Sequence, residues 1–350
     1  MVQTEKSNKR DIRKLKSDEL KKFFTEQGDK PFRAVQVEEW LWRKSAKSFD
    51  QMTNLSVATR DLLKENFTIN HIHVDTMQRS ADGTIKNAVT LHDGLIVESV
   101  LIPAEKRITA CVSSQVGCSL ACKFCATARL KRQRNLSADE IYDQVAAIKE
   151  QSETIFNRPL TNIVFMGMGE PLLNYSNVVA AIDKITSPKG LGMAMKRITV
   201  STVGIAKMII KMADDGVKFN LAVSLHAALD DTRSSIMPIN DSNPLKELGD
   251  ALRYWYEKTK RKVTYEYVVW QGVNDTEEHA KALLQFCKII PSKVNLIEYN
   301  PIDGGDFKQA NDAVLKMYMD LLEKNGITTR IRKSRGKDID AACGQLANKS

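Results

Sequence analysis

The chain has 350 residues, of which 43% are hydrophobic and 27% charged, with a net charge of +9 and six cysteines. No run approaches the ~18 apolar residues of a membrane span, and the first residues lack the apolar stretch of a secretory signal, so we expect a cytoplasmic protein without a membrane role. In that reducing compartment, cysteines predict metal ligands, catalytic thiols or core residues before structural disulfides. The basic charge is typical of a nucleic-acid binder, although a merely basic enzyme fits it equally well.

Residues 1–75 predict a small helical module. The segment SDELKKFFTEQG carries a capping serine at Ser17 and a terminating glycine at Gly28. The segment KPFRAVQVEEWLWRKSA places Pro31 in a first helical turn and repeats apolar residues on a helical period. A third helix is expected over LSVATRDLLKENF.

Residues 76–107 predict a short β-hairpin, because two apolar runs flank the turn dipeptide Asp93-Gly94. From residue 108 to residue 350, six candidate strands alternate with helical patterns. This order predicts an α/β fold with a closed or partial (β/α)6 barrel, and a doubly wound open sheet remains the alternative. The six candidate strands are ITACVSS, TNIVFMGM, RITVST, FNLAVSL, TYEYVVW and VNLIEYN.

Four cysteines lie within CVSSQVGCSLACKFC, residues 111–125, and three of them form Cys118-x3-Cys122-x2-Cys125 after the first predicted barrel strand. A structural zinc site wants a second cysteine pair or nearby histidines, and the sequence places neither close by. A cubane iron–sulfur cluster accounts for three thiolates better, because its fourth iron then stays open to chelate a small molecule.

This spacing, with Phe124 before the last cysteine, resembles the radical S-adenosylmethionine (SAM) superfamily, in which the open iron holds SAM. The next strand ends in MGMGEP, which resembles the superfamily segment that binds the methionyl amine of SAM. Glycines such as Gly167 and Gly169 let a backbone approach a ligand closely, and Glu170 suits an ammonium group. A tight turn with a solvated glutamate is the simpler reading of these residues.

Three later strand ends also carry polar groups. Each group alone is more often a turn residue, but together they predict a ligand site at one rim of the barrel. For His226 we favour a SAM contact or a structural hydrogen bond over metal ligation. The three sites are Ser201, the run Ser224-Leu225-His226, and Asn300.

For two further residues, the sequence supports a catalytic and a structural interpretation equally well. Cys343 lies among small residues in DIDAACGQL, which suits either an accessible reactive thiol or a buried small hydrophobe. Glu98 lies on an apolar strand face in LIVESVLIP, where a carboxylate costs desolvation unless it is paired. It could serve proton transfer or a structural ion pair.

Taken in order, CVSSQVGC, CKFCAT, MGMGEPLLN, SLHA, MPIN, EYV, NLIEYNP and DIDAACGQL resemble the RlmN family of RNA adenine methyltransferases. The resemblance covers almost the whole chain, including PFRAVQV and IVESV. The related Cfr enzymes methylate C8 of the same adenosine and usually read GMGEA, so GMGEP favours RlmN. The implied cofactor residues are Cys118, Cys122 and Cys125 for a [4Fe-4S] cluster and Gly169, Glu170, Ser201, Ser224, Leu225, His226 and Asn300 for SAM.

The resemblance also implies a mechanism that uses two SAM molecules per turnover. Cys343 takes a methyl group from the first, and the second gives a 5′-deoxyadenosyl radical that abstracts hydrogen from this S-methyl group. The methylene radical adds to C2 of adenosine and joins enzyme to RNA. Glu98 matches the proton acceptor of the family. Cys111 matches the thiol that attacks Cys343, releasing methylated RNA and leaving a transient disulfide.

The implied substrates are adenosine 2503 of 23S rRNA and, in some members, adenosine 37 of tRNA. We expect residues 1–75 to contact RNA, an electron donor such as flavodoxin, and a monomer. The basic runs KRQR (131–134) and RKSRGK (332–337) predict either phosphate contacts or a solvated surface. Two alternatives stay open, namely a radical SAM enzyme acting on a protein or small molecule, and a non-catalytic RNA-binding protein with a metal-stabilised loop.

Overall fold

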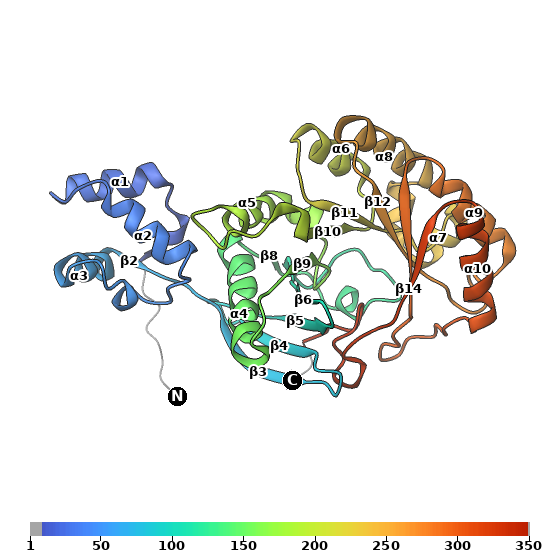
Figure 1. The fold of residues 1–350 in the computed structure, drawn as a ribbon, viewed down its shortest axis with the longest axis horizontal. Coiled ribbons are helices and arrows are strands. Elements are labelled where there is room, and N and C mark those ends of the chain that lie inside the picture. The colour runs from blue at the N-terminus through green and yellow to red at the C-terminus, as the bar shows by residue number, and fades with distance from the viewer. Residues whose placement is uncertain (1–8, 349–350) are drawn as a thin grey trace.

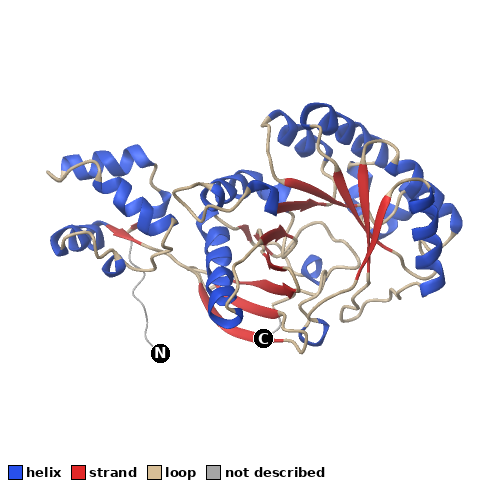
Figure 2. Ribbon diagram, in the orientation of Figure 1, coloured by secondary structure: helices blue, strands red, loops and turns tan. Residues whose placement is uncertain are grey.

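The computed structural model describes residues 9–348. Within them, a ten-stranded sheet runs in the order β14-β13-β12-β11-β10-β9-β6-β5-β4-β3, with a small helical module beside it (Figures 1 and 2). No helix in this part of the chain has the length and apolar character needed to cross a membrane.

The N-terminal module contains the three expected helices. The first of them begins at Ser17, but Ser17 does not cap it; instead the Glu19 carboxylate accepts the N–H of Lys16 at 2.7 Å. Gly28, with φ +74°, follows the end of that helix, as predicted. The helices are α1 (Ser17–Glu26), α2 (Arg33–Trp42) and α3 (Val57–Asn66), accompanied by the short strands β1 (Arg10–Asp11) and β2 (Phe67–Thr68).

A buried ion network attaches this module to the barrel. The Arg13 side chain is 3% exposed, and its Nη1 donates to Asp143 of α4 (Ala138–Phe156) at 2.8 Å. Its Nη2 lies 3.5 Å from Asp139 on the same helix. Removing one partner of such a pair leaves an uncompensated buried charge, which typically costs about 3–5 kcal/mol.

The segment expected as a hairpin is a three-stranded extension of the main sheet. The strands β3 (His73–Arg79), β4 (Ile85–Thr90) and β5 (Ile96–Ala104) are antiparallel, and β5 continues the ladder onto β6 (Arg107–Cys111). The turn at Asp93-Gly94 is present, with Gly94 at φ +84°. Residues 76–107 are therefore part of the sheet that carries the barrel.

Seven strands of the ten-stranded sheet run parallel, the six predicted ones and a seventh, β14, at the edge. Helices cover their outer face (Figure 1), and the sheet stays open in the part of the chain described, so the partial barrel is confirmed. In this sheet the strands after β6 are β9 (Asn162–Phe165), β10 (Ile198–Thr202), β11 (Asn220–Ser224), β12 (Val263–Val268), β13 (Ser292–Ile297) and β14 (Thr328–Arg332), while β7 (Gln115–Val116) and β8 (Arg134–Asn135) form a separate pair. The helices after α4 are α5 (Tyr175–Thr186), α6 (Ala206–Asp214), α7 (Asp230–Ile236), α8 (Leu245–Thr259), α9 (Glu277–Cys287) and α10 (Asp312–Lys324).

The alternation along β12 shows how the strands divide core from site. Tyr265 packs edge-on against Phe286 of α9, and Tyr267 packs on Tyr318 of α10, so these side chains face the helical layer. Because successive side chains of a strand point to opposite faces, Glu266 points into the barrel. Glu266 accordingly lines the interior cavity although it is 4% exposed.

Candidate active site

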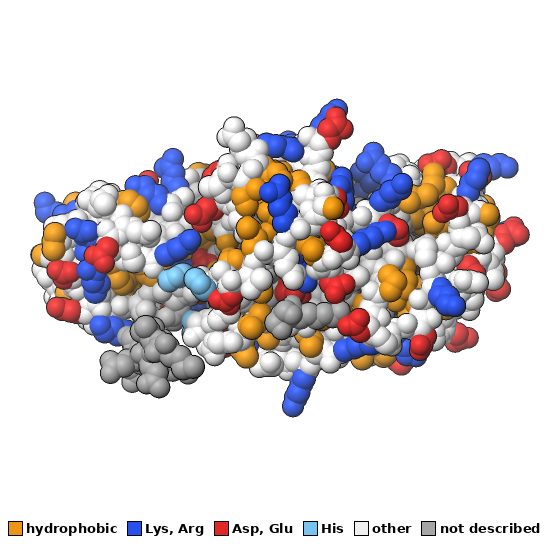
Figure 3. All heavy atoms as spheres, turned by 90° about the horizontal axis from the view of Figure 1, so that it is seen from below, with side chains coloured by type: hydrophobic (Ala, Val, Ile, Leu, Met, Phe, Trp, Pro, Cys, Tyr) orange, Lys and Arg blue, Asp and Glu red, His pale blue; other side chains and the backbone are white. Residues whose placement is uncertain are grey.

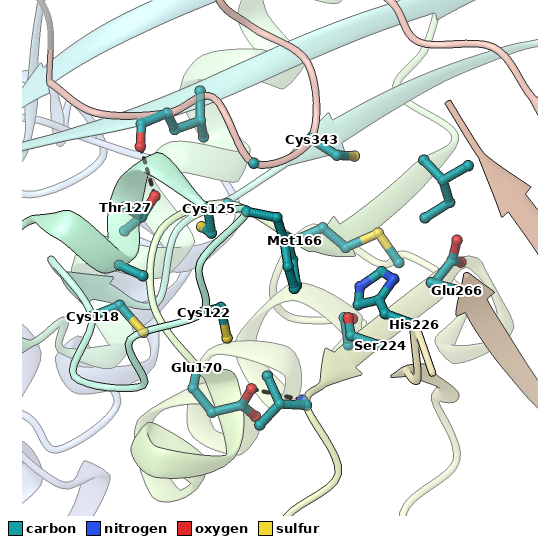
Figure 4. A pocket seen from close by; sticks show the side chains of 18 of the residues that line it. Cys118, Cys122, Cys125, Thr127, Met166, Glu170, Ser224, His226, Glu266 and Cys343 are labelled. Carbon is teal, nitrogen blue, oxygen red and sulfur yellow. Dashed lines mark hydrogen bonds between the residues drawn. The ribbon is translucent and has the colours of Figure 1, made fainter. Parts of the chain in front are cut away.

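A cavity opens at the carboxyl ends of the parallel strands (Figure 4). Barrel enzymes place their chemistry at this end, because the loops that follow the strands converge there. Of the described residues singled out by their motifs, those that line this cavity are Cys118, Cys122, Phe124, Cys125, Gly167, Gly169, Glu170, Ser201, Ser224, His226, Asn300 and Cys343.

The three spaced cysteines share one wall of the cavity (Figure 4). Their loop is held by backbone bonds, including Cys125 N–H to the Cys122 carbonyl at 3.2 Å and Lys123 N–H to the Ile236 carbonyl at 3.0 Å. Burial raises the pKa of Cys118 to about 11, and neighbouring Cys125 and Glu170 add to the rise. The pKa of Cys122 is raised by burial and by the two other thiols. Thiolates crowded in this way need a cationic group between them, and an iron–sulfur cluster meets that need.

The Glu170 carboxylate is buried behind these thiols. One of its oxygens accepts the Leu172 N–H at 3.1 Å and the other accepts the Val203 N–H at 3.0 Å. Burial raises its pKa to about 7, although these hydrogen bonds oppose the rise. An ammonium group placed in the cavity would compensate the buried carboxylate, which fits the amine of SAM. The alternative of a solvated glutamate is wrong.

The glycines before Glu170 line the cavity and also meet another part of the chain closely. A Cβ on Gly167 would lie 2.7 Å from Ser113 Oγ, and a Cβ on Gly169 would lie 2.4 Å from Gln115 Cβ. Gly169 also has φ +92°, a conformation that side-chain-bearing residues rarely adopt. The close approach is therefore to residues 113–115 of the chain itself, which carries this segment to the cavity wall.

His226 combines a structural hydrogen bond with a place on the cavity wall. Its Nδ1 accepts the Val268 N–H at 3.2 Å, and its carbonyl accepts Nδ2 of Asn274 at 2.7 Å. Burial lowers its pKa to about 3, so the ring is neutral and carries its proton on Nε2. The ring packs 4.7 Å from Phe124, which places it beside the cysteine loop. Neighbouring Leu225 is fully buried and does not line the cavity.

The C-terminal loop brings Cys343 to the same cavity, where its side chain is exposed. Nδ2 of Asn300 donates to the Cys343 carbonyl at 3.2 Å, and the Gly344 carbonyl accepts the Ala126 N–H at 2.7 Å. The Asn300 Oδ1 is buried without a hydrogen-bond partner among the described residues, so it can accept from a ligand. The prediction of an accessible Cys343 thiol is confirmed.

Glu98 lies behind this loop and does not line the cavity. Its carboxylate is 1% exposed and lies 3.3 Å from the ammonium of Lys86, which is 6% exposed. The other carboxylate oxygen accepts the N–H groups of Ala347 and Asn348 at 2.8 and 3.1 Å. The structural reading, a buried ion pair, is confirmed. A role as proton acceptor stays a prediction.

Cys111 ends β6 and is buried just outside the cavity lining. Burial raises its pKa to about 12; Cys343 adds to the rise, whereas Arg332 and the Met166 N–H oppose it. Cys111 and Cys343 therefore lie within electrostatic reach of each other, although more than 230 residues separate them in sequence. Cys287 is buried in α9, as expected of a core residue.

Sequence reasoning missed three charged residues of the interior. Glu266 and Arg332 line the cavity and lie 3.7 Å apart. Arg233 is fully buried and donates to the carbonyls of Val203 and Leu225, which fixes the ends of β10 and β11. A strict count of alternating positions in TYEYVV would have placed Glu266 in the interior. No local pattern distinguishes Arg332 from the basic run that contains it.

Comparison with known proteins first defines the class of protein. Residues 10–69 match the family described as ribosomal RNA large subunit methyltransferase N-terminal domain, and residues 112–284 match the radical SAM superfamily. A solved structure of a radical SAM methyltransferase from Sphaerobacter thermophilus superposes with a TM-score of 0.91 at 37% identity, covering 97% of this chain and 100% of that one. The protein is a radical SAM methyltransferase, with a [4Fe-4S] cluster and SAM as its cofactors.

Curated relatives then define the family. A protein of Christiangramia forsetii is 65% identical over 345 residues, covering 99% of this chain and 98% of its own length. One of Flavobacterium psychrophilum is 67% identical over 341 residues, covering 97% and 98%. Both are described as probable dual-specificity RNA methyltransferases RlmN. The chain belongs to the RlmN family of radical SAM RNA methyltransferases, and the resemblance drawn from its motifs is confirmed.

Proposed function

We propose that the protein methylates C2 of adenosine 2503 in 23S rRNA and C2 of adenosine 37 in some tRNAs. The observation that carries this proposal is a second pair of thiols, Cys343 and Cys111, beside the three that suit a cluster. A radical SAM enzyme for a protein or small molecule has no use for that pair. Methylation of C8 at the same adenosine, as in Cfr enzymes, is the alternative, and MGMGEP argues against it.

The target carbon explains why radical chemistry is needed. C2 of adenine is an electron-poor sp2 carbon without a lone pair, so it cannot displace a methyl group from SAM. When bound, the cluster and SAM supply an electron and a 5′-deoxyadenosyl radical, with Cys118, Cys122 and Cys125 as the ligands. Covalent catalysis on Cys343 then divides one difficult transfer into separate steps.

Each cavity residue has a proposed part in holding SAM. The Glu170 carboxylate binds its ammonium group, because a buried carboxylate is stabilised by a nearby cation. The unpartnered Oδ1 of Asn300 accepts a hydrogen bond from it, and Nε2–H of His226 donates one. Ser201 and Ser224 add hydroxyl groups on the neighbouring strands β10 and β11. Leu225 does not line the cavity, but its buried side chain fixes the backbone that carries Ser224 and His226.

The remaining residues are assigned to removal of the C2 proton and to release of RNA from its covalent bond with Cys343. We assign Glu98 as the acceptor of the C2 proton, and this assignment has a structural consequence. Because one carboxylate oxygen is occupied by the Ala347 and Asn348 amides, the end of the C-terminal loop must move before Glu98 can reach the base. Cys111 then attacks the sulfur of Cys343 and frees the RNA, since a thiolate is competent for such an exchange.

RNA contact is proposed for the N-terminal module and its junction with α4. A surface hollow there is lined by four cations and three carboxylates, and Lys47 and Lys149 pair with Glu150 and Glu153. Arg43 and Lys44 are the other two cations. Figure 3 shows histidine side chains beside the module on a face scattered with Lys and Arg. Such a surface suits the phosphate backbone of a folded RNA.

The two basic runs differ in what they offer to RNA. Lys131 and Arg132 are exposed, whereas Arg134 is paired with Glu140 at 2.8 Å. In residues 332–337 Arg332 lines the cavity, and the exposed Arg335 and Lys337 are paired with Asp82 and Glu298. We therefore assign phosphate contact to residues 131–132. A flavodoxin-like electron donor and a monomeric state stay predictions.

The function is tested by nucleoside mass spectrometry of RNA treated with the reconstituted enzyme, SAM and a reductant. We expect 2-methyladenosine at adenosine 2503 and none with the Cys343→Ala variant. A product methylated at C8 would assign the chain to Cfr-type chemistry. Methylation of tRNA at adenosine 37 in the same assay would establish dual specificity.

A further inference from the structure

Arg332 reaches from β14, at one edge of the sheet, toward the end of β9. It ends β14, its side chain is 32% exposed, and its Nη1 lies 3.7 Å from Oε2 of Glu266. The same nitrogen lies 4.0 Å from the sulfur of Met166, the residue that follows β9. Arg332, Glu266, Met166 and Cys343 all line the cavity, where Figure 4 shows Met166 and Glu266 on the wall below Cys343.

Met166 also links Arg332 to Cys111. Cys111 pairs with Val164 in the β6–β9 ladder, two residues before Met166, and the Met166 side chain contacts the guanidinium. The guanidinium therefore reaches the strand pair that carries Cys111, and it lines the same cavity as Cys343. The Glu266 carboxylate is 5% exposed, and its Oε2, which has no hydrogen-bond partner among the described residues, lies 3.7 Å from the guanidinium. This buried carboxylate therefore holds the guanidinium of Arg332 in place.

The electrostatic effects are consistent with this geometry. Two charged or titratable groups act on Cys111, namely Cys343 from the C-terminal loop, which disfavours its thiolate, and Arg332 from β14, which favours it. Arg332 has a pKa that is raised despite burial, and the groups that raise it are Cys343, Glu266 and Cys111. The nearest carboxylate on β5, Glu98, is neutralised by Lys86.

We infer that Arg332 is a positioning residue that stabilises the thiolate of Cys111 for its attack on Cys343, an inference that rests on the proposed function. In this step the Cys111 sulfur gives an electron pair to form the disulfide with the Cys343 sulfur. The bond from that sulfur to the methylene carbon breaks, and its electron pair stays on carbon, which takes a proton to become methyl. The two sulfurs are oxidised and the carbon is reduced, so no external oxidant is needed. Arg332 offsets the cost of the buried thiolate.

The test measures alkylation of Cys111 in cluster-free, fully reduced protein. Iodoacetamide labelling is followed by peptide mass spectrometry from pH 7 to pH 10. In Arg332→Met we expect labelling about tenfold slower at each pH, equivalent to one pKa unit. Arg332→Lys keeps the charge and should stay within about threefold of the wild type. The control Arg330→Met removes an exposed positive charge from the same strand and should leave the profile unchanged.

A second readout follows the covalent step itself. In a single turnover, Arg332→Met should accumulate the protein–RNA adduct at neutral pH and release it as the pH rises. If that variant fails to fold because Glu266 loses its partner, the double variant Arg332→Met/Glu266→Gln removes both charges and is expected to show the same slow labelling. Labelling of Cys111 at the wild-type rate in either variant overturns the inference. Failure of the wild type to methylate RNA would instead reject the proposed function, and the labelling result would still stand.

Discussion

The buried pair of Lys86 and Glu98 gives the sharpest prediction on stability. Replacing Lys86 by methionine keeps most of the unbranched side chain but removes the ammonium that lies 3.3 Å from Glu98. The carboxylate would keep the N–H groups of Ala347 and Asn348 but would have no counter-charge, at 1% exposure. Uncompensated burial of this kind costs about 3–5 kcal/mol, and the two amide bonds favour the lower end of that range.

The double variant Lys86→Met/Glu98→Gln should recover most of the loss, because the glutamine oxygen still accepts both amide N–H groups and no charge remains buried. The matched control is Lys149→Met, which breaks the ion pair with Glu153 on α4, where the two side chains are 41% and 50% exposed. That change should cost less than about 1 kcal/mol.

Urea unfolding of cluster-free protein, followed by circular dichroism, measures the free energy of unfolding of all four proteins. The reasoning is refuted if Lys86→Met unfolds within 1 kcal/mol of the wild type, or if the double variant is no more stable than the single one.

Three further predictions concern the cavity and the Cys111 thiol beside it. The pKa of Glu170 is raised to about 7 from 4.5, so its contribution to folding is complete below pH 4.5 and is lost as the pH rises through 7. Glu170→Gln should remove a fall of about 3 kcal/mol in the unfolding free energy of cluster-free protein between pH 4.5 and pH 8, and equal pH dependence of the two proteins would contradict this. Gly169→Ala places a Cβ 2.4 Å from Gln115 at φ +92° and should cost about 2–4 kcal/mol, against about 1 for Gly272→Ala, which meets nothing within 4 Å; similar losses in both would count against the close approach. Cys111→Ala should accumulate a protein–RNA adduct on denaturing gels, and recovery of only free enzyme would exclude its resolving role.

Much of the barrel can be predicted from sequence because its strands are short apolar runs between amphipathic helices. The cysteine loop and the glycine-rich segment can be located for the same reason, since each directly follows such a run. β3 is harder to predict because most of HVDTMQR is exposed at the sheet edge and shows no clean alternation.

Sequence spacing does not show which residues far apart in the chain come into contact. The ion pair of Glu98 depends on Lys86 from β4 and on amides 347 and 348, and none of these is close in sequence. Arg332 reads as one residue of a basic run, and only the register of β14 on β13 turns it toward the cavity. The approach of Cys343 to Cys111 was likewise suggested by family resemblance and not by spacing.

The central claim is methyl transfer to C2 of an RNA adenosine through Cys343. The most direct measurement uses SAM carrying a CD3 methyl group, with mass spectrometry of both Cys343 and the target adenosine. We predict a CD3 group on Cys343 before turnover and a methyl group with two deuterium atoms from that methylene at C2 afterwards. A CD3 group transferred intact to adenosine, or label on RNA without any on Cys343, would contradict the account.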